Sequence, residues 1–290
     1  TVFDKNEHPG GMLRYGIPSF KLEKDVIDAE IDILRELGVT IRCGVEVGKD
    51  VTLAQQRAQG YKAFYLAIGC QGGRTAGVPG EDAAGIQTAV ALLRTVGGDE
   101  SHKMTGKTVV IGGGNVAIDA ARVALRCGSS DVTMVCLEPR EKMPASAEEI
   151  AEAEEEGTAI RCGYGPKEFL TKDGHVCGVV LKRCTGLYDA EGRFAPTYDE
   201  SVTITLPCDN VVLSIGQCIQ WGNLLDGEAV QLGRGQGAVA DAMTYQTAQS
   251  DIFVGGDVYT GPRFAIDAIA AGKQGAISIH RFVQPNTSLT

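Results

Sequence analysis

The sequence predicts an α/β fold with parallel strands, and three neighbouring features of the chain support this class. A short run of β-branched residues, Thr108–Ile111, has the composition of a buried parallel strand. It leads through a glycine-rich turn into an alanine-rich helical segment, Val116–Cys127, which stops at Gly128. A second apolar strand, Val132–Leu137, follows and ends at Glu138. This strand–turn–helix–strand order is typical of a doubly wound parallel sheet.

The turn in this unit has the spacing Gly112-x-Gly114-x-x-Ala117. Gly112 allows the sharp bend, Gly114 allows the backbone to approach a pyrophosphate, and the small Ala117 allows the helix to pack on the strand. Free N–H groups at the helix start then face the phosphates, which the helix dipole also favours. An acid at the tip of the second strand, Glu138, completes the pattern. The sequence therefore predicts a dinucleotide site here.

Composition restricts the possible partners and the compartment. Of the 290 residues, 27 are Lys or Arg and 37 are Asp or Glu, so the formal charge of −10 argues against nucleic acid and anionic membranes. No apolar run approaches the ~20 residues of a membrane-spanning helix, and the strand-like first residues suggest no signal peptide. The nine cysteines are scattered, without a Cys-x-x-Cys pair. We expect reduced thiols, a cytoplasmic protein, and no dithiol or iron–sulfur centre within this chain.

The chain begins with a short predicted strand, Thr1–Phe3, that ends at Asp4. An acid in that place is typical of the second strand of a dinucleotide fold, where it meets a ribose hydroxyl. The glycine turn that should lie about 20 residues earlier is absent. A helix over Leu22–Leu37 is predicted from its apolar spacing, with Gly38 as its stop.

The next segment is predicted to alternate between strand and helix. Strands are expected over Val39–Val47 and Tyr61–Ile68, with a short helix over residues 51–59 between them. Gly69 ends the second strand. A glycine- and proline-containing linker follows, and we place the first crossing between domains there.

The middle of the chain holds the dinucleotide turn and a predicted β-meander. Ile86–Val96 is predicted to be helical, and Glu148–Glu156 is predicted to form an acidic helix with a solvated face. Two strands, Val176–Cys184 and Ser201–Thr205, are expected to flank an exposed turn over Gly186–Asp199.

The last third repeats features of the first. Val211–Gly216 is a buried strand that ends in glycine, like Leu66-Ala67-Ile68-Gly69. Asp251–Asp257 is a strand that ends in Gly-Gly-Asp, and a helix rich in small residues follows over Ala265–Ser278. The positive end of that helix can point at an anionic planar ligand. The whole series predicts two Rossmann-like dinucleotide-binding domains, one inserted in the other.

The series resembles the two-dinucleotide-binding-domain flavoproteins and, more narrowly, the small (beta) subunit of glutamate synthase and its paralogues. The likeness spans nearly the whole chain. It is carried by four motifs: Pro9-Gly10-Gly11-Met12-Leu13-Arg14-Tyr15-Gly16-Ile17-Pro18, Gly112-Gly113-Gly114-Asn115-Val116-Ala117-Ile118-Asp119-Ala120-Ala121-Arg122, Met143-Pro144-Ala145 and Gly255-Gly256-Asp257.

The resemblance implies that the outer domain holds FAD and the inserted domain holds NAD(P)H. Hydride would pass from nicotinamide to flavin, and electrons would leave through iron–sulfur clusters on an N-terminal domain to a partner subunit. That partner would be amidotransferase-like or another reductase. The implied domains are residues 1–78 and 211–290 for FAD and residues 79–210 for NAD(P), with the meander attached to the latter.

The resemblance also assigns cofactor-binding residues one by one. For FAD these are Asp4 on the adenosine ribose, Gly11, Met12, Leu13 and Ile17 along the pyrophosphate and flavin, Val47 by the adenine, Gly256 and Asp257 near the ribityl or pyrophosphate, and the helix from Ala265 at the flavin pyrimidine edge. For the nicotinamide dinucleotide they are Gly112, Gly114, Asn115 and Val116. Ala67, Gly69 and Gly216, at the ends of the two Ile-Gly strands, complete the set.

No acid, base or nucleophile of the protein is required, because hydride moves directly between two cofactor rings. The predicted catalytic set is therefore empty. The four histidines show no metal spacing, so no metal ligands are predicted either.

Two departures from the family pattern bear on function. Relatives that use NADPH usually carry two adjacent basic residues where this chain has Leu137-Glu138. A carboxylate accepts hydrogen bonds from a ribose 2′-OH and repels a 2′-phosphate, so NADH is favoured, although Arg140 is near enough in sequence to reach a phosphate. The second departure is that the cluster-bearing domain, the first FAD strand and its glycine turn are missing.

The chain is therefore expected to be a fragment whose FAD half is impaired. The alternative function is a non-catalytic NAD(H)-binding module without bound flavin. A disulfide reductase is disfavoured by the missing Cys-x-x-Cys, and a methyltransferase by the Gly-Asp closure and the second lobe.

Overall fold

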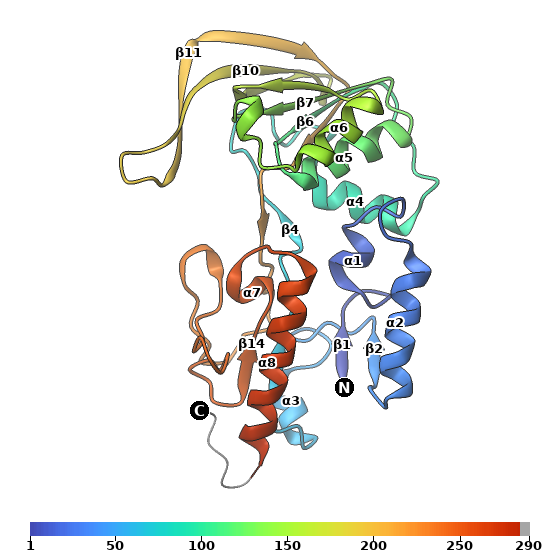
Figure 1. Ribbon diagram of the computed structural model, residues 1–290, viewed down its shortest axis with the longest axis vertical. Coiled ribbons are helices and arrows are strands. Elements are labelled where there is room, and N and C mark those ends of the chain that lie inside the picture. Colours follow the sequence, from blue (N-terminus) through green and yellow to red (C-terminus); the bar gives the residue numbers. More distant parts are fainter. Residues whose placement is uncertain (285–290) are drawn as a thin grey trace. The chain divides into compact units, whose positions relative to one another are not determined.

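A computed structural model describes residues 1–284. The chain forms two compact units that are each assembled from separate stretches of sequence. The first unit comprises Thr1–Arg14, Leu22–Gly72 and Gln217–Thr290, of which 285–290 lie outside the described residues. The second unit comprises Tyr15–Lys21 and Gly73–Gly216. Figure 1 shows both units with many of their elements labelled.

The second unit is built on a five-stranded parallel sheet with the strand order β5-β12-β6-β7-β8. Strand β6 stands at its centre, between β12 and β7, and consists almost entirely of buried β-branched residues. Such strands are buried on both faces, which explains the continuous apolar run in the sequence. The strands are β5 (Ile86–Thr88), β6 (Lys107–Ile111), β7 (Asp131–Cys136), β8 (Ala159–Cys162) and β12 (Asn210–Leu213).

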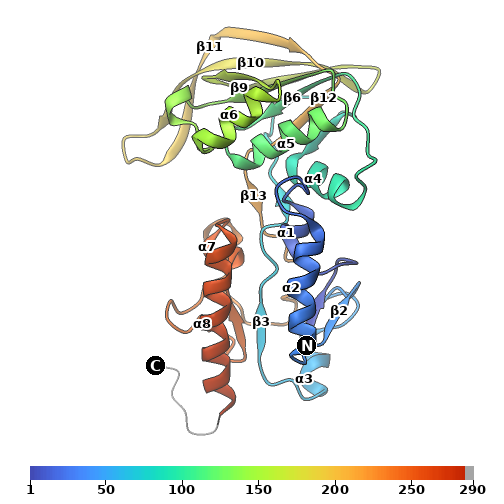
Figure 2. The same cartoon turned by 45° about the vertical axis from the view of Figure 1, so that its right-hand side comes forward.

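Two layers cover the two faces of this sheet (Figure 2). The side chains of its strands point alternately into one layer or the other. Val110 and Val212 point toward a core shared with the helices α4 (Ala89–Gly98), α5 (Asn115–Arg126) and α6 (Ala147–Glu155). Their neighbours Val109 and Val211 point the other way, into a core shared with an antiparallel sheet. The alternation follows from the two-residue period of a strand.

That antiparallel sheet has the order β11-β10-β9 and contains the predicted meander. Its strands β10 (His175–Tyr188) and β11 (Phe194–Pro207) are longer than the sequence predicted, and β9 (Tyr164–Lys172) was not foreseen. The expected exposed turn over Gly186–Asp199 is wrong, because most of it is paired in a long hairpin arm that extends from the sheet in Figure 1. The pairing was hidden because the arm is largely solvent-exposed and carries little apolar alternation.

The first unit contains two separate pairs of parallel strands. Strand β1 (Val2–Asp4) pairs with β2 (Ile41–Cys43), and β3 (Phe64–Leu66) pairs with β14 (Ile252–Val254). The predicted strand over Val39–Val47 is shorter than expected, since only its centre is paired.

Helices surround these strand pairs. The helix α2 (Lys24–Glu36) is followed by its C-cap Leu37 and then by Gly38 with φ of 91°, so the predicted helix and its glycine stop are confirmed. The long helix α8 (Ala265–Val283) runs beside β14 (Figure 1). The others are α1 (Gly11–Tyr15), α3 (Leu53–Ala58) and α7 (Asp257–Thr260).

The short remaining elements include one correction to the sequence prediction. The segment Ile86–Val96 was predicted as one helix, but its first three residues form β5 and the helix begins only at Ala89, where Thr88 caps it. Sheet pairing with β12 outweighs helix propensity there. The two-stranded sheet of β4 (Gly72–Gly73) and β13 (Gln217–Cys218) and the short helices η1 (Arg140–Lys142) and η2 (Arg234–Gln236) complete the described chain.

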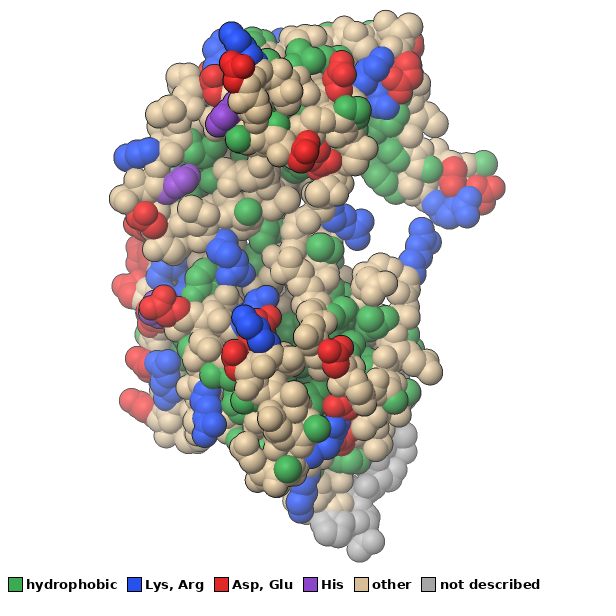
Figure 3. All heavy atoms as spheres, turned by 180° about the vertical axis from the view of Figure 1, so that it is seen from behind, with side chains coloured by type: hydrophobic (Ala, Val, Ile, Leu, Met, Phe, Trp, Pro, Cys, Tyr) green, Lys and Arg blue, Asp and Glu red, His purple; other side chains and the backbone are tan. Residues whose placement is uncertain are grey.

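Three further properties of the described residues concern membranes, surface charge and cysteines. No helix within residues 1–284 is both long and apolar enough to cross a membrane. On the face seen in Figure 3, acidic and basic side chains are interspersed. All nine cysteines lie in the described residues and all are free thiols.

Candidate dinucleotide site

The glycine turn lies directly after β6, at the carboxyl edge of the sheet, where ligands bind in open α/β folds. Gly112 has φ of 146°, and an added Cβ atom would lie 2.3 Å from the carbonyl oxygen of Ser214, just after β12. Both the backbone conformation and the close approach therefore require glycine at this position. The turn keeps Gly112 tied to β7, since its N–H donates to the Val135 carbonyl at 2.8 Å.

Gly114 is the residue before α5, and no side chain caps the helix there. Nothing lies within 4 Å of the place where its Cβ would be, so the start of the helix is open to an approaching group. The 12-residue helix directs its positive end at this opening. Ala117 is fully buried, as its packing role requires, and Val116 is partly buried against the same core.

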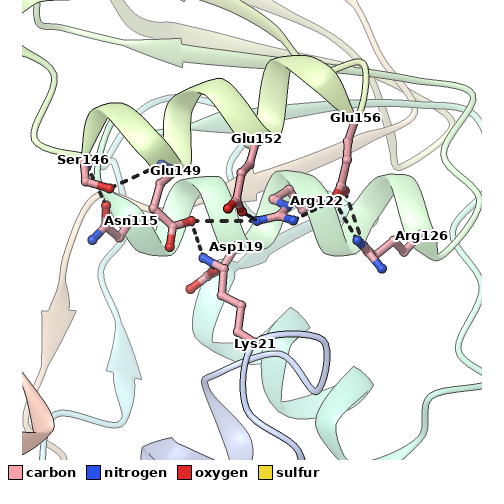
Figure 4. A network of polar contacts seen from close by, with 9 residues as sticks. All are labelled: Lys21, Asn115, Asp119, Arg122, Arg126, Ser146, Glu149, Glu152 and Glu156. Atoms are coloured by element: carbon pink, nitrogen blue, oxygen red, sulfur yellow. Dashed lines mark hydrogen bonds and ion pairs between the residues drawn. The ribbon is translucent and has the colours of Figure 1, made fainter.

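A loop between β7 and α6 closes over the turn. Asn115 accepts a hydrogen bond at Oδ1 from the backbone N–H of Ser146, 3.0 Å away, and Ala145 donates its N–H to the Gly113 carbonyl at 3.0 Å. The resemblance assigns Asn115 to the nicotinamide dinucleotide, and in the structure its side chain anchors this loop. Figure 4 shows Asn115 and Ser146 facing each other across the starts of α5 and α6.

Glu138 follows β7 and lies beside the turn. Its Oε2 is 3.1 Å from the position that a Cβ on Gly113 would take, and its backbone carbonyl accepts the N–H of Gly163 at 3.2 Å. Arg140 is exposed and forms an ion pair with Glu154 of α6. The guanidinium is therefore already matched with a carboxylate, and this pairing raises the pKa of Arg140.

A polar network joins α5, α6 and the segment Tyr15–Lys21 (Figure 4). Lys21 contacts both Asp119 and Glu149. Arg122, whose side chain is only 8% exposed, pairs with Glu152 and Glu156. The ring of Phe20 lies under the guanidinium groups of Arg122 and Arg126, 4.8 Å and 4.0 Å from their centres.

This network corrects the prediction for the acidic helix. Glu149, Glu152 and Glu156 do not simply form a solvated face, because they neutralise arginines of the neighbouring helix. Burial raises the pKa of Asp119, and the contact with Lys21 opposes that rise. The sequence could not have located Lys21 here, since it lies 98 residues before Asp119 and belongs to a different predicted domain.

In the first unit, the ends of β3 and β14 meet. The Gly255 N–H donates to the Leu66 carbonyl at 3.4 Å, and the Cys70 thiol approaches the Asp257 carbonyl at 3.6 Å. The structure thereby brings together one group of predicted cofactor-binding residues. The group comprises Ala67, Gly69, Gly256, Asp257 and Ala265.

Asp257 contacts the segment that leads into α8. Its Oδ1 accepts the backbone N–H of Arg263 at 3.2 Å, and burial raises the pKa of its carboxyl. Gly256 has φ of 68°, and a Cβ added to it would lie 3.6 Å from the Cβ of Ala268 on the first turn of α8. Ala265 begins that helix and is exposed.

Tyr65, which the sequence reasoning missed, explains two glycines of this region. A Cβ on Gly255 would lie 1.9 Å from the Tyr65 hydroxyl, and one on Gly275 would lie 2.2 Å from its ring. Gly255 is therefore small because it packs against an aromatic ring. Burial raises the pKa of Tyr65 to about 12. A β-branched or aromatic strand residue facing a glycine-rich helix is the signal that could have indicated this contact.

The other predicted flavin-site residues of the first unit lie near β1 and α1. Asp4 accepts hydrogen bonds at Oδ1 from the backbone and side-chain amides of Asn6, each at 2.9 Å. Gly11 begins α1 with φ of 52°, and no atom lies within 4 Å of its Cβ position. Met12 and Leu13 follow in α1, and Leu13 lines an apolar recess against α2. Val47 packs against the core of the unit.

Two predicted residues belong to the second unit instead. Ile17 lies in the segment Tyr15–Lys21, which packs with that unit. Gly216 has φ of 116°, and its carbonyl accepts the N–H of Arg74 at 3.1 Å. Within residues 1–284, no cluster of three or more His, Cys, Asp or Glu side chains is arranged to hold a metal ion.

Residues 33–272 match the family described as pyridine nucleotide-disulphide oxidoreductase, and the chain belongs to this family. Within it, the chain is similar to glutamate synthase small chains and their paralogues. It is 36% identical over 99% of its length to the NADP(+)-dependent formate dehydrogenase subunit beta of Moorella thermoacetica, of which it covers 41%. It is 32% identical over 96% of its length to a putative glutamate synthase [NADPH] small chain of Cereibacter sphaeroides, of which it covers 70%.

A third relative is named for NAD, whereas the names of the first two contain NADP(+) or NADPH. The chain is 31% identical over 98% of its length to the NAD-dependent dihydropyrimidine dehydrogenase subunit PreT of Escherichia coli O157:H7, of which it covers 62%. The chain thus spans about two-fifths to three-fifths of the length of several curated relatives that it matches.

Solved structures show the same fold at lower identity. The chain resembles FprA from Mycobacterium tuberculosis with a TM-score of 0.79 and 19% identity, covering 97% of this chain and 77% of the other. The thioredoxin reductase of T. acidophilum gives a TM-score of 0.66 at 19% identity, covering 97% and 89%. The predicted fold of two dinucleotide-binding domains is confirmed.

Proposed function

We propose that this chain binds a nicotinamide dinucleotide at the glycine turn of the second unit and passes its hydride to FAD held by the first unit. The observation that carries the proposal is the uncapped start of α5 behind Gly112 and Gly114, open to a pyrophosphate and bordered by Glu138. An uncapped helix start with small residues around it favours phosphate binding. The family assignment supports the same chemistry.

NADH is proposed as the preferred coenzyme. Glu138 stands beside the turn, where its carboxylate suits a ribose diol and repels a 2′-phosphate. Arg140, the nearby cation, is already paired with Glu154 and so attracts a phosphate less strongly. The relatives divide on this point, since PreT is named as NAD-dependent and the other two relatives as NADP- or NADPH-linked.

The residues of the first unit fit one part of an FAD molecule. The joined ends of β3 and β14, with Gly256 at φ of 68° and the exposed start of the 19-residue helix α8, offer backbone groups and a helix dipole to an anionic ligand. When bound, FAD would supply a ring that accepts hydride and then releases electrons singly. Asp4 would hold its adenosine ribose, and Gly11 to Leu13 would follow its pyrophosphate.

The protein's own task is to position the two cofactors and to balance charge. The start of α8 would stabilise negative charge that develops on a reduced ring at its N-terminal end. No acid, base or nucleophile of the chain is needed for hydride to move between two rings held in contact.

A partner subunit is proposed as the final electron acceptor. The similar proteins include chains named as subunits, among them a formate dehydrogenase subunit beta and glutamate synthase small chains. Electrons would leave through iron–sulfur clusters toward an amidotransferase-like or other reductase subunit. A cytoplasmic location is proposed with it.

A second candidate is a module that binds NAD(H) and turns nothing over. One feature favours it: the two parallel strand pairs of the first unit are separate and do not form one continuous sheet, whereas dinucleotide folds bind their ligand at the edge of a continuous sheet.

Flavin content and NADH titration separate the two candidates. The purified chain is first loaded with FAD and then titrated with NADH. If the first proposal holds, the absorbance of the bound oxidised flavin falls as NADH is added. A chain that binds NADH but never retains flavin, even with FAD in excess, supports the second. A chain that binds neither nicotinamide dinucleotide contradicts both.

A further inference from the structure

Two cysteine thiols lie side by side at the carboxyl ends of β7 and β8. Cys136 and Cys162 are direct register partners on these neighbouring parallel strands, so their side chains leave the same face of the sheet. Their sulfur atoms are 3.7 Å apart. Adjacent strands are separated by about 4.8 Å, which lies within the Cα separation of about 4.4–6.8 Å that a disulfide needs.

The two thiols differ in exposure and in hydrogen bonding. Cys136 is 2% exposed and donates its S–H toward the sulfur of Cys162. Cys162 is half-buried, and its sulfur lies 3.9 Å from that of Met143. Burial raises the pKa of Cys136, which keeps it a donor, and the Arg140 guanidinium interacts electrostatically with both thiols. Cys162 is therefore the more accessible nucleophile, and the more buried Cys136 is the neighbouring thiol that can react with it after oxidation.

We propose that Cys136 and Cys162 form a peroxide-sensitive modification site that closes to a disulfide. The Cys162 thiolate attacks hydrogen peroxide, the O–O bond breaks, and Cys162 becomes a sulfenic acid as hydroxide takes up a proton to leave as water. The Cys136 sulfur then attacks the Cys162 sulfur, the S–O bond breaks, and the Cys136 proton leaves with hydroxide as a second water. Two thiols and one peroxide thus give one disulfide and two waters, with two electrons passing from sulfur to oxygen.

The disulfide would act on the dinucleotide site, and this part of the inference rests on the proposed function. A Cβ on Gly113 would lie 2.8 Å from the Cys136 Cβ, so the Cys136 side chain packs directly against the glycine turn. The same thiol lies 3.5 Å from the Glu138 carbonyl. Drawing the Cys136 sulfur toward Cys162 removes its S–H and moves the contacts that hold Glu138 and Met143 in place. We expect the affinity for NADH to fall about fivefold, the effect of losing one ordinary hydrogen bond.

The test treats the full chain, first fully reduced and then exposed to hydrogen peroxide. Intact mass and peptide mapping measure whether two hydrogen atoms are lost and whether peptides containing Cys136 and Cys162 become linked. The same samples are titrated with NADH, and dithiothreitol is added to reverse the change. Cys162→Ser is the test variant, and Cys177→Ser, which alters an exposed thiol on β10, is the matched control.

A link between Cys136 and Cys162, with weaker NADH binding that dithiothreitol restores, supports the proposal. The Cys177→Ser control should behave like the wild type, and Cys162→Ser should lose both effects. If peroxide oxidises other cysteines but never links this pair, the modification site is refuted. A linked pair with unchanged NADH affinity refutes its effect on the dinucleotide site.

The proposed function fails separately, if the reduced wild type binds no NADH at all. The mass measurement still judges the thiol pair in that case. A trivalent arsenical, which bridges two neighbouring thiols without an oxidant, gives a further reading: wild type binds it and Cys162→Ser does not if the pair is accessible. Failure of the wild type to bind it counts against the site.

Discussion

The central strand of the second unit, β6, has hydrogen-bonded neighbours on both sides and carries the glycine turn at its end, whereas the strands of the first unit stand in two separate pairs. Each unit has strand ends, glycines and a helix start of the kind that bind a dinucleotide. In the second unit one continuous sheet fixes all of these parts relative to one another. In the first unit, the ends of β3 and β14 form one group and Asp4 with Gly11 forms another.

The difference shows that motif content alone does not make a binding site. The second unit places its turn, its helix start and its acid within a single βαβ element, so local folding assembles them. The first unit draws its candidate residues from stretches as far apart in sequence as Asp4 and Asp257. We therefore expect the coenzyme site to tolerate isolation better than the flavin site.

The largest expected effect comes from filling the glycine turn of the second unit. Gly112→Val places a β-branched residue at φ of 146°, against a carbonyl oxygen that would lie 2.3 Å from its Cβ. We expect a loss of at least about 3 kcal/mol in the unfolding free energy and no NADH binding. Denaturant unfolding and NADH titration measure the two effects.

The matched control for this change is Gly114→Ala. Gly114 has an ordinary φ of −93° and no neighbour within 4 Å of its Cβ position, so its stability should change by less than about 1 kcal/mol. Coenzyme binding should still weaken, because the added methyl group occupies the approach to the helix start. Equal stability losses in both variants would contradict the assigned close approach at Gly112.

A change confined to the first unit tests whether the two sites are independent. Arg57 forms two 2.7 Å hydrogen bonds to Glu228, whose side chain is 5% exposed, and a 2.5 Å bond to Asp251. Arg57→Met leaves these carboxylates without their cation and should cost about 3 kcal/mol. NADH affinity should stay unchanged.

Thermal unfolding and NADH titration check the Arg57 prediction together. Arg35→Met, which removes an exposed pair with Asp32 on α2, is the control and should cost less than about 0.5 kcal/mol. A loss of NADH binding in Arg57→Met would mean that the coenzyme site depends on the first unit.

Variants of Glu138 test whether the site in the second unit prefers NADH to NADPH. Glu138→Gln should weaken NADH binding about tenfold and NADPH binding less, because a charged acceptor for the ribose hydroxyls is lost along with a repulsive charge. Glu138→Arg should favour NADPH. Dissociation constants for both coenzymes measure the preference.

The control for Glu138 is Glu141→Gln, an exposed acid in the neighbouring η1. It should leave both dissociation constants unchanged. If the wild type binds NADPH more tightly than NADH, the proposed preference is wrong whatever the variants do.

The smallest effect concerns pH and the network on α5. Burial raises the pKa of Glu156, but hydrogen bonds from Arg122 and Arg126 outweigh this and hold the pKa below its ordinary value of 4.5. A carboxyl with a lowered pKa contributes stability that is fully present above its ordinary pKa and is lost as the pH falls through the lowered one. Glu156→Gln should cost about 1 kcal/mol at neutral pH and progressively less in that acid range.

Unfolding measured between neutral pH and the acid range tests this prediction. Glu155→Gln, an exposed neighbour on α6, provides the baseline. A constant difference between Glu156→Gln and the wild type across the whole range would rule out the assigned ion pairs as its cause.

The sequence predicted the parts of the fold that local patterns encode. The apolar run of β6, the Gly112 turn, the small Ala117 and the Gly38 stop of α2 are each explained by neighbours only a few residues away. Such features follow from backbone conformation and short-range packing, and the structure has them where the pattern indicates.

The parts that could not be predicted depend on contacts distant in sequence. Tyr65 lies against Gly255 and Gly275, some 190 and 210 residues later, so no local sequence pattern predicts this contact. The long hairpin of β10 and β11 lacks a buried face over much of its length, which removes the alternation by which a strand is recognised. The candidate site divides in the same way, since the local coenzyme turn was foreseen and the anchoring of its loop by Asn115 was not.

The segment Tyr15–Lys21 bears on what can be exchanged between related proteins. It comes from the early part of the chain, yet Phe20 lies under two arginines of α5 and Lys21 supplies the cation for Asp119. A contiguous piece running from 73 to 216 would leave Asp119 buried without that cation and Arg122 without its aromatic neighbour. Any transplant of the coenzyme-binding unit into another scaffold must therefore carry this seven-residue segment along, or redesign the surface of α5 that it covers.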